Sequence, residues 1–143
     1  MKQFLVLVLT VLSSWSPVWA NLGDSGDTIE DSYGAIIERH LRDDGTVSVR
    51  YHKDRYLYAV IFAEGRSVSE MYSHIKGTDL SEKEIAGFLK ANAGGATWTP
   101  DKKTKERRFE RSDHNAEATY GNMAGRPTLT VRELHGSTPE TKN

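Results

Sequence analysis

The 143-residue chain contains no cysteine. It therefore forms no disulfide or zinc–thiolate site, and it has neither a thiol nucleophile nor the attachment point that a bacterial lipoprotein needs for its lipid. Disulfides commonly stabilise small domains in oxidising compartments. Without them, this chain must be held together by packing and hydrogen bonds alone. The sequence also contains no Asn-x-Ser/Thr acceptor for N-glycosylation.

Neither sign of charge dominates. The 19 basic residues are balanced by 20 acidic residues, which gives a formal net charge of −1. A protein that binds nucleic acid through its overall electrostatic field is usually strongly basic. We therefore expect no nucleic-acid partner.

Long apolar runs are also missing, apart from one short run close to the first residue. Lys2 precedes the apolar residues 4–12, and a small residue, Ala20, stands where a signal peptidase would cut. The run is about half of the ~20 residues that a helix needs to cross a bilayer. We predict that residues 1–20 are a cleaved signal peptide and that the mature protein, beginning at Asn21, is secreted or periplasmic. No membrane span is expected to be retained.

Catalytic and metal-binding patterns are absent as well. Ser112, Asp113 and His114 are consecutive, so they cannot pass a proton as a catalytic triad does, and they are more typical of a turn. The histidines do not follow the spacing of two metal ligands on one helical face. We predict no catalytic residues, no cofactor and no metal site. One alternative remains open, a weak metal site formed by side chains near a single hairpin: His40, Asp43, Asp44 and His52.

The mature chain begins with small polar residues and then alternates in the manner of strands. Residues 21–27 are predicted to form a flexible lead-in, followed by a helical turn over 28–33 that Asp27 caps. Strands are expected over 36–41 and 46–52, with a turn between them. The second of these strands alternates between apolar and polar residues, which indicates one buried and one wet face.

A longer apolar segment comes next. Residues 55–63 are apolar on both faces, which places them centrally in a sheet, with hairpin turns at 53–54 and 64–65. Residues 67–75 fit either a strand or a helix, because Ser67 and Glu70 have capping-box spacing. We favour a strand, since a hairpin turn directly precedes it. The tyrosines within these strands are expected to pack in the core rather than to bind carbohydrate.

A helix is the clearest single element. Ser81 and Glu84 form a capping box at its start, and Gly94 is expected to end it, so the helix covers about residues 82–93. It carries one apolar stripe and should lie across one face of a sheet. The predicted fold class is α+β: a two-layer domain over residues 28–135, in which one main helix covers an antiparallel β-meander sheet.

The remaining chain is charged and then strand-forming. Strands are predicted around Phe109, over 117–122 and over 128–134, and residues 136–143 are predicted to be a polar tail. Residues 101–111 form a charged stretch, and a solvated loop explains this stretch most simply. The same residues are also the densest basic patch of the chain and could bind an anion. The six cations of this possible anion site are Lys102, Lys103, Lys105, Arg107, Arg108 and Arg111.

Two segments carry a resemblance to known proteins. The run LSEKEIAGFLKANAGGATW (80–98), followed by RSDHNAEATY (111–120), resembles small secreted bacterial domains of uncharacterised function, of verrucomicrobial and planctomycete type. The resemblance implies export and a compact fold over most of the mature chain. It implies no activity.

Taken together, these features predict an exported, non-catalytic binding or structural domain of the cell envelope. A sheet edge is its expected contact with a protein partner, because an unpaired strand can accept another strand. The first alternative is a binder of anionic surfaces or polyanions that acts through the basic stretch. The second alternative is a small hydrolase that uses His114 or another histidine.

Overall fold

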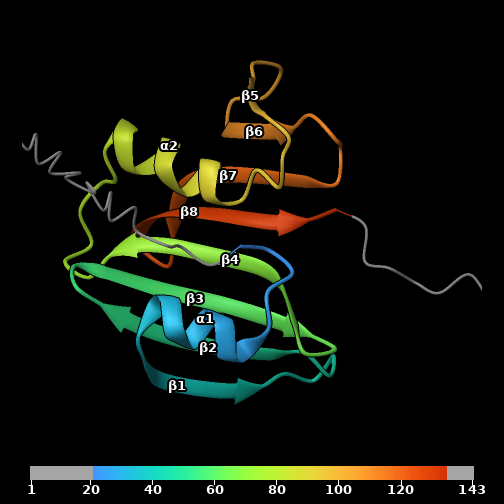
Figure 1. Cartoon of the computed structure of the whole chain (residues 1–143). Coiled ribbons are helices and arrows are strands. Elements are labelled where there is room, and N and C mark those ends of the chain that lie inside the picture. The colour runs from blue at the N-terminus through green and yellow to red at the C-terminus, as the bar shows by residue number, and fades with distance from the viewer. Residues whose placement is uncertain (1–20, 135–143) are drawn as a thin grey trace, which may run out of the picture.

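The computed structural model describes residues 21–134 (Figure 1). The predicted signal peptide over 1–20 and the predicted tail over 136–143 lie outside these residues. The elements in chain order are α1 (Gly26–Tyr33), β1 (Ala35–Leu41), β2 (Val47–Lys53), β3 (Tyr56–Ala63), β4 (Arg66–His74), α2 (Glu82–Ala91), β5 (Trp98–Asp101), β6 (Arg107–Arg111), β7 (Ala116–Met123) and β8 (Arg126–Glu133).

All eight strands form one antiparallel sheet in the order β1-β2-β3-β4-β8-β7-β6-β5. The two halves of the chain have the same element order, a helix followed by a four-stranded meander. The meanders meet where their last strands, β4 and β8, pair through residues such as Tyr72 and Leu129. In Figure 1, α1 lies over the half that contains β2 and β3, and α2 lies over the half that contains β7 and β8.

The expected antiparallel meander is confirmed, and the fold is mostly sheet. The predicted segment 67–75, which also fitted a helix, is a strand, β4, that covers Arg66–His74 and pairs with β3 from Tyr56–His74 to Ala63–Arg66. Three details of the sequence prediction were wrong. Two helices contribute to the core instead of one main helix, the strand β5 was not predicted, and the turn between β2 and β3 contains Asp54 and Arg55 rather than residues 53–54.

The first helix starts earlier than predicted. Ser25, not Asp27, is its N-cap, and the Ser25 side chain accepts a hydrogen bond from the Thr28 amide. The helix ends at Gly34, whose φ of 84° suits glycine. A Cβ atom on Gly34 would also lie 3.1 Å from the carbonyl oxygen of His52 on β2. A larger residue there would push α1 away from the sheet.

The segment before α1 was expected to be a lead-in without structure. Gly23 N donates to Ser67 O on β4 at 2.8 Å, and Ser67 N donates to Asp24 O at 2.9 Å. Leu22 N donates to the Asn92 side-chain oxygen at 2.9 Å. Residues 22–24 therefore lie against β4 and the end of α2.

The second helix has the capping box that the sequence predicts. The Glu84 amide donates to Ser81 Oγ, and the Ser81 amide donates to the Glu84 carboxylate. The helix ends two residues earlier than expected, with Asn92 as its C-cap. Gly94 and Gly95 do not end the helix but belong to the following turn, where both have positive φ.

One face of the sheet carries the core. Both helices contribute to it: Ile29 and Tyr33 come from α1, and Ile85, Phe88 and Leu89 come from α2. The aromatic rings pack against one another as expected, with Tyr33 stacked on Tyr58 and Tyr72 stacked on Phe88. The inward strand residues of the core are Val49, Tyr51, Tyr58, Val60, Phe62, Tyr72, Phe109, Ala118, Leu129 and Val131.

A carboxylate lies at the centre of this core. Glu70 on β4 has no exposed surface, and its oxygens accept hydrogen bonds from Tyr33 Oη at 2.8 Å, from Ser67 Oγ at 3.0 Å and from the Tyr72 hydroxyl. Asn92 then donates to the Tyr72 hydroxyl at 2.8 Å. We call these five residues the Glu70 network. It joins α1, β4 and the end of α2.

Burial raises the pKa of Glu70 to about 7, although hydrogen bonds from Tyr72, Tyr33 and Ser67 act to lower it. The folded protein therefore holds a proton on Glu70 between about pH 4.5 and pH 7, where the unfolded chain has lost it. In this interval the unfolded state binds fewer protons, so the free energy of unfolding falls as the pH rises. The fall levels off above about pH 7.

We predict that Glu70→Gln removes this component of the pH dependence. The expected component is about 3 kcal/mol between pH 4.5 and 8, since one pKa unit corresponds to 1.36 kcal/mol. Urea unfolding of both proteins across this range measures it. Glu30→Gln on the exposed surface of α1 is the control and should keep the wild-type slope. An unchanged slope in Glu70→Gln would show that Glu70 does not titrate between these pH values.

We also predict that Ser81→Ala lowers the free energy of unfolding by about 1 kcal/mol, because the Glu84 amide loses its capping oxygen. Denaturant unfolding at constant pH measures the loss. Lys83→Ala, at an exposed position in the same helical turn, is the matched control and should change stability by less than about 0.5 kcal/mol. Equal losses in the two variants would contradict a capping role.

Candidate functional site

The sheet has two edges, and they differ in their capacity to accept another strand. The β5 edge has four residues and includes Pro100, which has no amide hydrogen to donate. The β1 edge has seven residues, and every one of them is exposed. No residue of β1 belongs to the core. The long, uncovered edge is therefore β1.

The register shows which peptide groups of β1 point away from the sheet. Arg42 N donates to Thr46 O at 2.9 Å, at the turn into β2. Bonding alternates along an antiparallel pair, so His40 and Glu38 also face β2, while the peptide groups of Arg39 and Leu41 point outward. A register shift between Ile36 and Glu38 interrupts the ladder before them. The regular part of the free edge is thus short.

Apolar side chains accompany this edge. Leu41 is 70% exposed, Ile37 is 54% exposed and Ile36 is 38% exposed. Isolated exposed aliphatic residues are ordinary, but three of the six large apolar residues exposed in residues 21–134 lie on this one strand. A strand that is added to β1 would cover Leu41.

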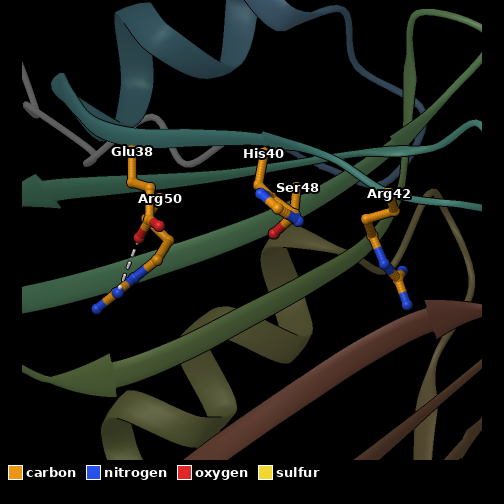
Figure 2. Close-up of a pocket in the computed structure, with 5 residues that line it drawn as sticks. All are labelled: Glu38, His40, Arg42, Ser48 and Arg50. Atoms are coloured by element: carbon orange, nitrogen blue, oxygen red, sulfur yellow. Dashed lines mark hydrogen bonds and ion pairs between the residues drawn. The ribbon is translucent and has the colours of Figure 1, made fainter.

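Beside the edge, on the sheet face opposite the core, lies an open pocket of about 350 Å³. Figure 2 shows its lining: two side chains come from β1, one from the residue just after β1, and two from β2. Glu38 and Arg50 are joined by an ion pair of 3.2 Å, His40 lies beside Ser48, and Arg42 extends separately. The pocket residues are Glu38, His40, Arg42, Ser48 and Arg50.

Opposite charges flank His40 at the C-terminal end of β1. Glu38 and Arg42 lie four residues apart on the same face, with His40 between them. Hydrogen bonds from Thr46 lower the pKa of Asp44, which lies 4.0 Å from Arg42. All these charged groups are solvated, so we expect each to contribute specificity more than binding energy.

The predicted basic patch is divided by the structure. Arg107 donates to the Glu82 carboxylate on α2 at 2.7 Å, and Arg111 donates to Asn92 O at 2.9 Å. Arg108 lies 3.9 Å from Glu117 on β7. These three arginines form contacts within the fold. Only the lysines remain together, on the exposed turn between β5 and β6: Lys102, Lys103 and Lys105.

Ser112, Asp113 and His114 lie in the turn between β6 and β7, as their composition predicts. Asp113 accepts hydrogen bonds from Arg111 Nε at 2.9 Å and from the Asn115 amide at 3.1 Å. His114 Nδ1 lies 2.7 Å from Glu110. The histidine and the aspartate therefore have different partners, and the three residues do not have the arrangement of a triad.

The alternative metal site at the first hairpin is also not formed. Ala35 pairs with His52 and Leu41 pairs with Val47, which places His52 at the opposite end of the hairpin from Asp43 and Asp44. The four candidate ligands are thereby separated along the length of the hairpin. Within residues 21–134, no group of three or more His, Asp or Glu side chains could hold a metal ion.

The sequence predicted a contact through a sheet edge but did not indicate which edge of the sheet is open. Strand order depends on pairing between distant segments, and Pro100 was the one local sign that β5 is unsuited to pairing on both sides. The charged residues of β1 gave no separate signal, because alternating charges are common on any wet strand face.

No helix among residues 21–134 is long and apolar enough to cross a membrane. Comparison with known proteins identifies no relative: no family model, no curated protein and no solved structure matches the chain. The resemblance to small secreted bacterial domains therefore stays a prediction.

Proposed function

We propose that this chain is an exported, non-catalytic binding domain that accepts a strand from a protein partner along β1. One observation carries the proposal: all seven residues of β1 are exposed, and the peptide groups of Arg39 and Leu41 point away from the sheet. An extended segment placed there gains four backbone hydrogen bonds, two at each residue. This is recognition by strand addition.

The residues beside the edge define which strand fits. An incoming antiparallel strand places alternate side chains next to Glu38, His40 and Arg42 on the open face. A cation suits the position opposite Glu38, and an anion suits the position opposite Arg42. An apolar residue on the other face would cover Leu41. The preferred partner strand therefore carries opposite charges four residues apart.

A two-layer α+β arrangement with both helices on one side fits this role. The core residues of α1 and α2 belong to one cluster with the inward residues of β2, β3 and β8. This leaves the opposite face and the β1 edge accessible from solvent. Rigid strands behind the edge would hold it in an extended form before a partner arrives, which lowers the entropic cost of binding.

The cell envelope or the extracellular space is the proposed place of action, because residues 1–20 have the pattern of a signal peptide. A domain without cysteine keeps the same covalent structure in an oxidising compartment. The β-bulge near Ile36 and the charges of β1 limit indiscriminate pairing of the edge, which an exported domain at high local concentration needs.

We predict that Leu41→Pro lowers the affinity for the partner at least tenfold. Proline removes an outward amide donor and breaks no hydrogen bond to β2, so folding should be preserved. Co-purification from the native envelope, followed by titration of the recovered partner, measures the effect. Leu41→Thr keeps the amide and serves as the matched control. Failure to recover any reproducible partner, or equal binding by Leu41→Pro, would contradict the proposal.

A further inference from the structure

We propose that the strand that fits the β1 edge is β1 of a second copy of this chain, so that two copies form an antiparallel dimer across their edges. The inference rests on the proposed function, since it uses the same free edge. It goes further by naming the partner. Self-pairing joins the two eight-stranded sheets into one continuous sheet.

The alternation of inward and outward peptide groups along β1 restricts how two β1 strands can pair. The outward peptide groups belong to Arg39 and Leu41, so these residues must occupy hydrogen-bonded positions in both copies. A two-fold register with its axis at His40 satisfies this condition, because Arg39 of each copy then lies opposite Leu41 of the other. Two such pairs supply four backbone hydrogen bonds.

This register also pairs opposite charges. Glu38 of each copy comes opposite Arg42 of the second copy, on the open face and on both sides of the axis. Glu38 already lies 3.2 Å from Arg50 in its own chain, so in the dimer it would lie between two guanidinium groups. On the other face, the aliphatic part of Arg39 would cover Leu41, which is 70% exposed in the single chain.

Two neighbouring registers also use the outward peptide groups, with the axis at Arg39 or at Leu41, but both are less favourable. An axis at Arg39 places Arg39 directly against Arg39 of the second copy, which is repulsive. An axis at Leu41 requires Asp43 to pair with Arg39, but β1 ends at Leu41 and residues 43–45 form a turn. Charge and strand length therefore both select the axis at His40. Residues 38–42 are complementary to themselves, because the two-fold axis places Glu38 of each copy opposite Arg42 of the other.

The dimer should be weak and sensitive to salt. Five residues per copy bury much less than the ~1,600 Å² of a standard interface, so we expect dissociation in the micromolar range or above. The charge pairs are solvated, and added salt screens them with a Debye length of about 8 Å at 0.15 M. Sedimentation should show a concentration-dependent dimer that weakens between low and high salt.

Charge reversal tests the register. Glu38→Arg and Arg42→Glu should each be monomeric at concentrations where the wild type is dimeric, because each homodimer contains two like-charged pairs. An equimolar mixture should dimerise again, since the pairs between the two variants are opposite in sign. Glu106→Arg and Lys76→Glu, at exposed positions off the edge, are the matched controls and should stay dimeric. Dimerisation of either single edge variant, or a mixture that stays monomeric, would overturn the register.

Crosslinking gives a second measurement that does not depend on affinity. The chain has no cysteine, so His40→Cys introduces a single thiol. Opposite residues at a non-hydrogen-bonded position have Cα atoms about 4.5 Å apart, within the 4.4–6.8 Å range of disulfides. His40→Cys should therefore form a disulfide dimer under mild oxidation. Ser48→Cys, which lies one strand inward, would be about 14 Å from its equivalent and should not.

The outcomes separate this inference from the proposed function. A wild type that remains monomeric at all concentrations, with no His40→Cys crosslink, overturns the dimer. If it still captures an envelope protein in a manner that depends on the Leu41 amide, strand addition to a different partner stands. A dimer that Leu41→Pro leaves intact overturns the β1 edge as its interface.

Discussion

The buried carboxylate of Glu70 is the constraint on which the rest of this structure depends. A buried carboxyl group without hydrogen-bond partners is costly in either protonation state, so Glu70 requires its hydroxyl partners, and those partners come from different segments. Tyr33 lies on α1, Ser67 lies on β4 beside residues 22–24, and Tyr72 is in turn held by Asn92 at the end of α2. Satisfying one side chain thus fixes both helices against the same face of the sheet.

The location of the Glu70 network explains what remains uncovered. Glu70 pairs with Val60 on β3 and with Val131 on β8, so it lies at the seam between the two meanders. Tyr33 of α1 and Asn92 at the end of α2 reach the Glu70 network, whereas β1, three strands away from β4, contributes no residue to the core. Because no side chain of β1 packs in the core, charged residues such as Glu38, and Arg42 just after the strand, remain solvated there. A stable centre and an accessible edge are two results of the same packing.

Local patterns in the sequence predicted most single elements, whereas features that depend on distant partners were missed. Alternation predicted β2, and the spacing of Ser81 and Glu84 predicted the start of α2. Ser67 and Glu70 also had capping-box spacing, and the two side chains do bond at 3.0 Å, but within a buried strand rather than at a helix start. Sequence spacing cannot distinguish these cases, because Tyr33, 37 residues away, is what makes the buried strand possible.

The same limit applies to the candidate site. Short sequence patterns predict neither the order of the strands nor which peptide groups of an edge strand point outward. β1 could therefore be identified as the free edge only once the pairing of all eight strands was known. Once the edge is known, however, its sequence becomes informative. The register shift near Ile36 and the turn after Leu41 leave a short regular edge, in which the peptide groups of Arg39 and Leu41 point outward. In the strand addition that we propose, the few backbone hydrogen bonds would leave selection to the flanking side chains, and Glu38 and Arg42 would favour a strand with their own pattern reversed.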